Sequence, residues 1–447
     1  MDLFKLEKPD ISGVNIAKIL EQYNADRSLY SEAVYRACEP DYYYWDKVKY
    51  QIPPGNLNKT EYWALIKQVR KISSSQTPIK AESGEIFTWL RLGYTDEFLH
   101  RIDVQMGGKI FAEYKDIITP YGKQRILTKS IIEEAIASSQ LEGAVTTTPI
   151  AKKMLVENLR PKNKSERMIV NNYKTMQALQ NDYKDKRLSR EMLFELHALI
   201  TKDTIDKDKV YRYRNDQDGI TLNDQTKYIY HIPPKEEFMK LEMERLILYA
   251  NDEDKGGFVH PIVKAIFLHF WIGYLHPFYD GNGRLARTLF YWYLLRSGYW
   301  AVQYLPISLV IKEAPDKYGM AFVYAEQDDW DITYFYDFHI KKIMQAQKNF
   351  IEYLYRKTGE NATIEAVLDK KFNLNDRQKE VLKYLLFKDE NSYITPSSYV
   401  TLYKVSKMTA ISDLKKLEKM QLVYTKKFGK YVRYYGSDNL RQSIKIS

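Results

Sequence analysis

Chemically active side chains gather in one glycine-rich loop, His276 to Arg287. Apolar residues before and after it recur at three- and four-residue spacing, which predicts a helix over Phe258–Leu275 and a second helix directly after the loop. We expect Pro277 to end the first helix and Asn282 or Gly283 to open the second. Free backbone N–H groups at such a helix N-terminus bind anions, so the loop predicts a phosphate site.

The charged side chains of the loop suit a polyphosphate. Arg284 and Arg287 supply fixed positive charge for further phosphates. Asp280 would be repelled by an anion in this pocket unless a divalent cation lay between them, and Mg²⁺ carried by the polyphosphate is the natural bridge. His276 is a candidate base, because imidazole titrates near neutral pH.

Two other interpretations of the same glycines fail on their context. Gly281-x-Gly283-x-x-Ala286 fits a dinucleotide-binding fingerprint, but that fingerprint needs a strand before it and an acid about 20 residues later. A helix is predicted before the loop, and Ala301–Val310 contains no acid. Asn282-Gly283 could instead form a β-hairpin turn, but both flanks have helical periodicity.

A metal-dependent hydrolase is a further alternative. It would use His276 and Asp280 together with His260 or His269. This set lacks a pair of ligands four residues apart on one usable helix face, so the sequence favours the phosphate site.

The loop His276-x-Phe278-x-Asp280-Gly281-Asn282-Gly283-Arg284-x-x-Arg287 resembles the signature of the Fic family at every defined position. The resemblance implies a protein adenylyltransferase that moves AMP from ATP to a target hydroxyl. Transfer of phosphate or phosphocholine is the alternative within the family, and the complete loop favours AMP. The implied roles are His276 as base, Phe278 as packing residue, Asp280 as Mg²⁺ ligand, Gly281, Asn282 (also by its side-chain amide) and Gly283 as α- and β-phosphate ligands, Arg284 on the β-phosphate and Arg287 on the γ-phosphate.

A second short motif precedes the loop. Thr128–Leu141 is predicted to be a helix with Gly143 just beyond its end. A carboxylate at a helix C-terminus is unfavourable, so Glu142 should have a cationic partner, although a solvated surface glutamate is the simpler alternative. Ser138-x-x-x-Glu142-Gly143 resembles the inhibitory motif of autoinhibited Fic proteins. That resemblance implies that Glu142 pairs with Arg287 in the space of the γ-phosphate, and that it could orient water for removal of AMP.

Further elements must position these groups. Helices are predicted over Ser165–Ala178 and Ser189–Thr201, and we interpret His197 as a core histidine on an apolar face. Lys207–Ile232 contains the β-prone runs Val210–Tyr213 and Tyr228–Ile232, which predict a hairpin. In Fic proteins such a hairpin, the flap, holds the target peptide by strand addition before a Pro-Pro pair, here Pro233-Pro234. Lys209 stands where the family often has glycine.

The N-terminal part, residues 1–120, is expected to be mostly helical. Thr60–Ile72 has the spacing of an amphipathic helix. The aromatic cluster Pro40–Lys47 resembles the N-terminal module of larger Fic proteins, and we interpret it as a packing joint.

The C-terminal part has a different pattern. A long helix is predicted from Asp331 to about Arg356, followed by a charged linker, Lys357–Lys371. Beyond it come three helices, Asn375–Leu386, Pro396–Tyr403 and Ser406–Met420, and a hairpin over Leu422–Tyr435. This order resembles a winged helix-turn-helix domain, which would bind either DNA or protein. The cations that could meet DNA phosphates are Lys415, Lys416, Lys426, Lys427, Lys430 and Arg433.

These patterns predict a mainly α fold: an N-terminal helical module (1–120), a Fic domain with its inhibitory helix and flap (121–358) and a winged-helix domain (359–447). The partners expected are ATP, Mg²⁺, a target protein at the flap around Tyr228–Ile232, DNA and a second copy of the chain. The main alternative function is a DNA-binding regulator with a catalytically silent Fic core.

Composition agrees with this interpretation. With 45% hydrophobic residues among 447, the chain can build sizeable cores. The net charge of +10 permits contact with nucleic acid. Three features favour the cytoplasm as the location of the chain. It has one cysteine, it lacks an apolar run long enough for a membrane span, and Met1–Lys5 shows no signal-peptide pattern.

Overall fold

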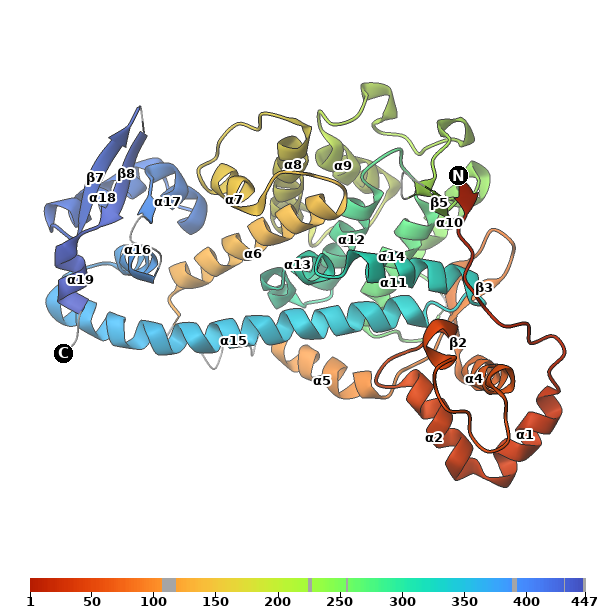
Figure 1. The fold of residues 1–447 in the computed structure, drawn as a ribbon. Helices are drawn as coiled ribbons and strands as arrows, with labels where there is room; N and C mark the ends of the chain where they lie inside the picture. The colour runs from red at the N-terminus through yellow and green to blue at the C-terminus, as the bar shows by residue number, and fades with distance from the viewer. Residues whose placement is uncertain (107–117, 224–226, 255, 388–391, 430, 445–447) are drawn as a thin grey trace.

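The computed structural model describes residues 1–106, 118–223, 227–254, 256–387, 392–429 and 431–444. Helices dominate it, as the sequence predicts (Figure 1). The helix α15 (Thr333–Lys371) runs along most of the length of the molecule, with the N-terminal helices at one end and the C-terminal elements at the other. Within the described residues, no helix combines the length and apolar character needed to cross a lipid bilayer.

The N-terminal part is helical with one small hairpin. The predicted helix over Thr60–Ile72 is confirmed as α4 (Lys59–Ser73), where Asn58 and Glu61 form a capping box. The β2–β3 hairpin was not expected from the sequence. The elements are β1 (Asp2–Leu3), α1 (Ile16–Ala25), α2 (Arg27–Cys38), α3 (Trp45–Val48), α4, β2 (Ser75–Lys80), β3 (Ile86–Trp89) and α5 (Tyr94–Met106).

The aromatic cluster Pro40–Lys47 does act as a packing joint. Tyr42 is buried, and its hydroxyl donates a hydrogen bond to Asp331 at 2.5 Å. The guanidinium of Arg70 lies 3.7 Å from the centre of the Tyr42 ring. Arg70 is fully buried and also donates to Tyr334 at 2.9 Å. These contacts attach the N-terminal helices to the start of α15.

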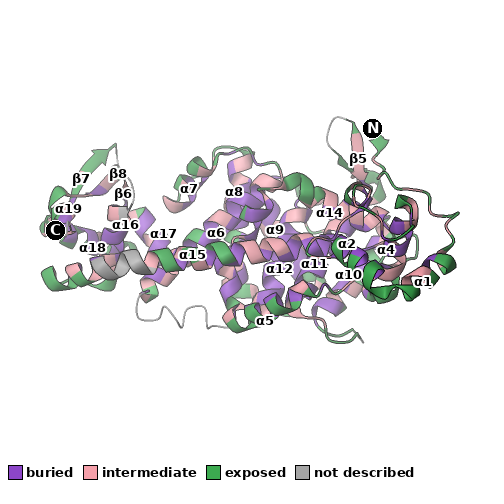
Figure 2. Cartoon of the chain, turned by 60° about the horizontal axis from the view of Figure 1, so that its bottom comes forward, coloured by how far each residue is buried: buried purple, intermediate pink, exposed green. Residues whose placement is uncertain are grey.

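Antiparallel helices form the central part. Nearly every residue of α11 is buried, which is why its sequence is apolar on all sides (Figure 2). The elements are α6 (Pro120–Leu141), α7 (Thr148–Val156), α8 (Lys164–Ala178), η2 (Leu179–Tyr183), α9 (Arg190–Thr201), η3 (Lys207–Lys209), η4 (Asp216–Asp218), β4 (Leu222–Asn223), β5 (Tyr228–His231), α10 (Glu236–Ala250), α11 (Pro261–Leu275), α12 (Asn282–Arg296), η5 (Trp300–Tyr304), α13 (Ile307–Ile311) and α14 (Pro315–Gln327). The helices predicted in this part are confirmed, although α6 begins at Pro120 rather than Thr128.

The predicted hairpin is only half right. β5 is a strand, but Val210–Tyr213 is not, and Tyr211 has a positive φ of 60° that breaks an extended run. The partner of β5 is β4 instead, with Leu222 opposite His231. On its other edge β5 pairs in parallel with β1, so the three strands lie in the order β1-β5-β4.

The predicted linker at Lys357–Lys371 is wrong, because α15 continues through it to Lys371. The elements after it follow the expected order: α16 (Asp376–Phe387), β6 (Tyr393–Ile394), α17 (Pro396–Tyr403), α18 (Lys407–Lys419), β7 (Val423–Phe428), β8 (Tyr431–Gly436) and α19 (Asp438–Ile444). β8 pairs with both β7 and β6. These elements enclose a hydrophobic core of their own, which also includes Leu368 of α15. Lys430 lies outside the described residues.

Candidate active site

The loop joins α11 to α12 by two residues with left-handed backbone. His276 closes α11 with φ 45° and ψ 57° and donates its N–H to Ile272 at 2.9 Å. Gly281 precedes α12 with φ 84°. A Cβ at Gly281 would lie 2.9 Å from a methyl group of Thr201, so both its conformation and its surroundings require glycine. The predicted helix ends are confirmed, and the N-terminus of α12 opens onto the loop.

Asn282 fixes the shape of the loop. Its side-chain oxygen accepts the N–H of Phe278 at 2.8 Å, and its side-chain nitrogen donates to the Phe278 carbonyl at 2.8 Å. The Asn282 side chain is almost fully buried. In this arrangement the amide is engaged within the loop, so contact with a phosphate would come from the backbone N–H of Asn282.

His197 and Arg214 support the loop from behind. His197 Nε2 lies 2.9 Å from the Asp280 carbonyl, and its ring stacks on Phe278 at 3.9 Å. Burial lowers the pKa of His197 to about 4, so the ring is neutral at neutral pH. Arg214 donates to the His276 carbonyl at 2.8 Å and to the Pro234 carbonyl. The interpretation of His197 as a core histidine is confirmed.

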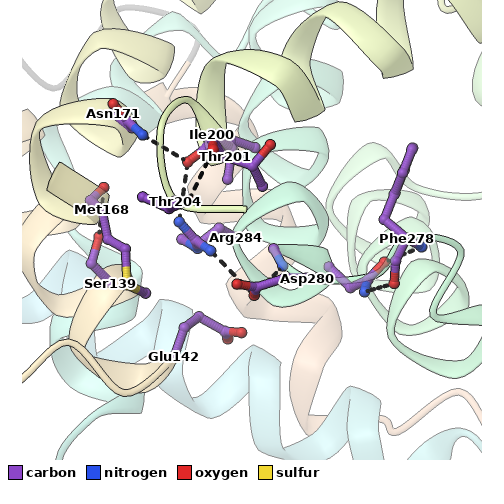
Figure 3. A network of polar contacts seen from close by, with 12 residues as sticks. Ser139, Glu142, Met168, Asn171, Ile200, Thr201, Thr204, Phe278, Asp280 and Arg284 are labelled. Atoms are coloured by element: carbon purple, nitrogen blue, oxygen red, sulfur yellow. Dashed lines mark hydrogen bonds and ion pairs between the residues drawn. The ribbon is translucent and has the colours of Figure 1, made fainter. Parts of the chain in front are cut away.

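Asp280 and Arg284 form an ion pair at the base of the loop (Figure 3). Their closest atoms are 3.4 Å apart, and Asp280 also accepts the Gly281 N–H at 2.5 Å. Arg284 is fully buried and donates to the Ile200 carbonyl at 3.1 Å. Asp280 keeps 35% of its side chain exposed, so a carboxylate oxygen remains accessible from the cavity.

Arg287 and Glu142 meet as the sequence predicts. Arg287 Nη2 donates to the Glu142 carboxylate at 2.9 Å. The same guanidinium donates to the Ser138 hydroxyl at 2.8 Å and to the Ser138 carbonyl at 2.9 Å. Burial lowers the pKa of Arg287, but the Glu142 carboxylate offsets this, and the pKa is raised overall. α6 thus presents its C-terminal turn to the buried cation of α12.

Glu142 also stands directly over the glycine-rich turn. A Cβ on Gly283 would collide with the Glu142 carboxylate. α6 ends as predicted, because Gly143 has φ 87° and the Ala144 N–H returns to Ser139 at 3.0 Å. Figure 3 shows Glu142 beside the Asp280–Arg284 pair. The carboxylate therefore occupies the positive end of α12, where a phosphate would otherwise lie.

Two cavities meet at this carboxylate. One, of about 470 Å³, is lined mainly by apolar and aromatic side chains such as Tyr318 and Phe322. The other, of about 500 Å³, is lined by the loop itself and by residues 218–223. The two cavities share four lining residues, Glu142, His276, Leu222 and Asn223. An apolar cavity joined to a polar one suits a ligand with a flat ring and a charged tail.

The His276 residue lines both cavities, and its Nδ1 is buried. Burial is the largest cause that lowers the pKa of His276, and the nearby charges of His231 and Arg214 lower it further, to about 3. The imidazole is therefore neutral at neutral pH, which is the protonation state that a general base requires, but a pKa this low makes it a weak base.

The flap strand β5 lies beside the cavities with both of its edges in use. β4 pairs with one edge, and β1 pairs with the other through a hydrogen bond from the Phe4 N–H to the Ile229 carbonyl at 2.8 Å. The Phe4 ring packs against Tyr230 at 5.0 Å. Both neighbours of β5 in this sheet are thus segments of the chain itself.

A metal ion carried by a phosphate ligand fits the site better than a resident one. No group of three or more His, Cys, Asp or Glu positioned to hold a metal occurs in the part of the chain that the structure describes. His260 contacts Asp103 at 3.0 Å and His269 contacts Tyr318 at 2.9 Å, so neither joins His276 in a ligand set. Asp280 offers one partly exposed carboxylate from the loop, which suits Mg²⁺ bound chiefly by phosphates and water.

Most predicted site residues line one or both cavities, whereas Arg284 and Arg287 are buried and line neither. Sequence reasoning assigned no role to Ser138, Arg214 or Tyr318, which contact Arg287 or the loop. Ser138 belongs to the motif that pointed to Glu142, so its spacing from Glu142 was an available signal. Arg214 and Tyr318 come from distant segments, and no local pattern marks them.

Comparison with known sequences matches the central part of this chain. Residues 187–294 match the family model described as Fic/DOC family. Proteins called protein adenylyltransferase Fic are similar over 99 residues: those of Drosophila persimilis at 32% identity (22% of this chain, 18% of that protein) and Drosophila melanogaster at 33% (22% and 19%). The match thus spans less than a fifth of these relatives.

Solved structures with a similar course of the chain include two Fic proteins. A Fic family protein from Desulfovibrio desulfuricans G20 is 18% identical, with a TM-score of 0.46, covering 76% of this chain and 96% of the other. Fic-1 from C. elegans is 16% identical, with a TM-score of 0.44, covering 77% and 86%.

Proposed function

We propose that this chain, which carries a Fic/DOC family domain at residues 187–294, is a protein adenylyltransferase that moves AMP from ATP to a hydroxyl of a target protein. The observation that carries the proposal is that the N-terminus of α12 and the neutral His276 ring line two adjacent cavities, and that the buried Arg287 guanidinium reaches them through its contact with Glu142. The distant relatives named as adenylyltransferases support the same activity.

The nucleotide would place its phosphates against the loop and its adenosine in the apolar cavity beside Tyr318 and Phe322. The backbone N–H groups of Gly281, Asn282 and Gly283 would bind α- and β-phosphate oxygens, Arg284 would steady the β-phosphate and Arg287 the γ-phosphate. Asp280 would hold Mg²⁺, which supplies charge neutralisation on the phosphates.

His276 is the proposed base. It would remove the proton of the target hydroxyl, whose oxygen then forms a bond to the α-phosphorus while the bond to pyrophosphate breaks. Bound phosphates add negative charge beside the ring, which opposes the effect of burial on its pKa and strengthens it as a base. Positioning and charge stabilisation would supply most of the rate.

Glu142 is the proposed inhibitor. Its carboxylate takes the Arg287 guanidinium that the γ-phosphate needs, and it stands over Gly283 where phosphate oxygens would approach. In the presence of an AMP-modified protein, the same carboxylate could orient a water molecule, which would make removal of AMP a second activity of the site.

Incubation with ATP labelled at the α-phosphate and Mg²⁺ tests the proposal. We expect label on protein tyrosine, serine or threonine, and we expect ATP labelled at the γ-phosphate to leave no label. Label from the γ-phosphate would indicate phosphate transfer instead.

A second function is proposed for the C-terminal elements, as a winged-helix domain within 359–447 that contacts DNA. Lys415 and Lys416 on α18 and Lys426 and Lys427 on β7 are exposed, although Lys416 also donates to the Asn373 carbonyl at 3.0 Å. Arg433 instead packs 4.0 Å from the Phe428 ring. If the chain acts only as a regulator, salt-dependent duplex binding should occur without any transfer of AMP.

A further inference from the structure

A third cavity, of about 840 Å³, lies between α6, α7, α15 and the C-terminal elements. It shares no lining residue with the two cavities at the loop. Figure 1 shows α6 and α7 facing α16 and α17 across this region, with α15 running beneath. Its volume lies within the range of pockets that bind small molecules.

The cavity is strongly cationic. Glu157 is the one acidic side chain among its lining residues, and that carboxylate accepts the Tyr393 hydroxyl at 2.7 Å. Just behind the lining, Glu133 contacts Lys152 at 2.8 Å and Glu380 contacts Arg125 at 3.2 Å. Among the described lining residues, cations therefore outnumber carboxylates. The cationic lining residues are Arg125, Lys129, Lys152, Lys153, Arg356 and Lys357.

Two of the cations differ in burial: Arg125 is largely buried and pairs with Glu380, whereas Lys129 keeps 50% of its side chain exposed. Arg125 has 16% of its side chain exposed, and its Nε is buried without a hydrogen-bond partner in the described structure. Burial lowers the pKa of Lys129, and although Glu133 opposes this, the neighbouring charges of Lys152 and Arg125 lower it further. Like charges gathered in a partly dry cavity are costly, and an anion would relieve that cost.

The remaining walls are aromatic and apolar. Tyr353, Tyr384 and Tyr393 line the cavity, and Lys129 Nζ lies 4.8 Å from the centre of the Tyr353 ring. Aliphatic side chains complete the wall: Ile126, Ile132, Val156 and Leu402. Rings and cations in one enclosed space suit a ligand that combines a flat ring with phosphates, more than they suit an extended nucleic-acid backbone.

We propose that this cavity binds a phosphorylated small molecule with an aromatic ring, of the size of a nucleoside diphosphate. Arg125, Lys129 and Lys152 contact its phosphates, and the tyrosines contact its ring. Because the walls come from α6 and α7 on one side and from α15 to α17 on the other, the ligand joins the C-terminal elements to the helix that ends at Glu142. The proposal is independent of the activity assigned to the loop.

Photo-crosslinking of the full-length chain with 8-azido-ADP in EDTA tests the proposal, with the labelled peptides mapped by mass spectrometry. We expect label on peptides that contain Tyr353, Tyr384 or Tyr393. The double variant Lys153→Glu/Arg356→Glu changes two exposed cations at the cavity, and its label on these peptides should fall about tenfold.

The matched control is Lys59→Glu/Lys71→Glu, which reverses two exposed charges on α4 at the other end of the molecule (Figure 1). It should leave the label unchanged. Label confined to peptides of the His276–Arg287 loop, or equal label in both double variants, would overturn the proposal. Loss of label on addition of duplex DNA but not of unmodified ADP would also overturn it, by assigning the cations to nucleic acid.

Discussion

The Glu142 carboxylate lies 2.9 Å from the Arg287 guanidinium and covers the Gly283 turn. A single side chain at the end of α6 thus contacts both the buried cation and the N-terminal turn of α12. In the proposed inhibition, its charge and its bulk would both oppose a bound phosphate.

Replacing Glu142 by Gly should raise labelling from α-labelled ATP, since Arg287 and the α12 N-terminus become accessible. We expect at least about a tenfold gain, equivalent to about 1.4 kcal/mol. Glu142→Gln keeps the bulk and removes the charge, so it should fall between Gly and the wild type. Equal or lower labelling in the glycine variant would remove Glu142 from the inhibitory role.

Replacing His276 by Ala should lower transfer by about 10²–10⁴-fold, the usual contribution of a general base. Nucleotide binding, measured by calorimetry in the Glu142→Gly background, should be nearly unchanged, because the phosphate ligands lie on α12. His260→Ala is the control, since His260 caps the same helix α11 at its other end. Transfer at the parent rate in the His276 variant would exclude it as the base.

Asp280 should set the dependence on magnesium. In Asp280→Asn the Mg²⁺ concentration for half-maximal transfer should rise about tenfold or more, because a neutral amide binds the ion more weakly. EDTA should abolish transfer in both proteins. Unchanged magnesium dependence in the variant would place the ion on other groups.

The pairing of β1 with the flap should limit access of target proteins. Phe4→Ala removes the ring contact with Tyr230 and should loosen β1, which tryptic cleavage at Lys5 would report. In the Glu142→Gly background we expect more label on proteins of a cell lysate and unchanged hydrolysis of ATP. If cleavage increases without any gain in label on target proteins, β1 does not guard the flap.

Acid should destabilise the fold through its buried histidines. Burial lowers the pKa of His339 to about 3 from an ordinary 6.5, and the pKa of His269 falls well below 6.5 for the same reason. Below pH 6.5 the unfolded chain binds protons that the folded chain does not, so stability decreases as pH falls toward 3. Each such histidine lowers the free energy of unfolding by about 1.4 kcal/mol for each pH unit in this window.

Urea unfolding at pH 7 and pH 5 measures this loss. His339→Phe removes one titrating group from a cluster that already contains Phe335 and Phe338, so the variant should lose less stability between the two pH values than the wild type. An identical loss in both proteins would show that His339 does not titrate as described.

The helix ends around the loop and the cationic partner of Glu142 could be predicted because their signals are local in the sequence. Pro277, Asn282 and Gly143 mark the helix ends, and a carboxylate at the C-terminus of a helix is unfavourable without a cation. Arg214 could not be predicted in this way, because it reaches the His276 carbonyl from 62 residues away. The parallel pairing of β1 with β5 is similarly non-local, and two residues carry no strand signal of their own.

The charged segment at Lys357–Lys371 shows the opposite error. Gly359 and a high density of charge suggested a linker, but a single glycine costs a helix only about 1 kcal/mol. Ile364 and Leu368 recur four residues apart and are buried in the C-terminal core, which stabilises the helix across the charged stretch. The apolar residues of this segment do recur at helical spacing, but its high content of charged residues obscured that pattern.

The unbroken 39-residue α15 has a geometric consequence. At about 1.5 Å per residue the helix is roughly 60 Å long. A continuous helix, unlike a flexible linker, keeps the elements at its two ends at one separation. The C-terminal elements are therefore held at a fixed distance and direction from the His276–Arg287 loop, so under the proposed function a molecule bound to them would reach the loop in only one position.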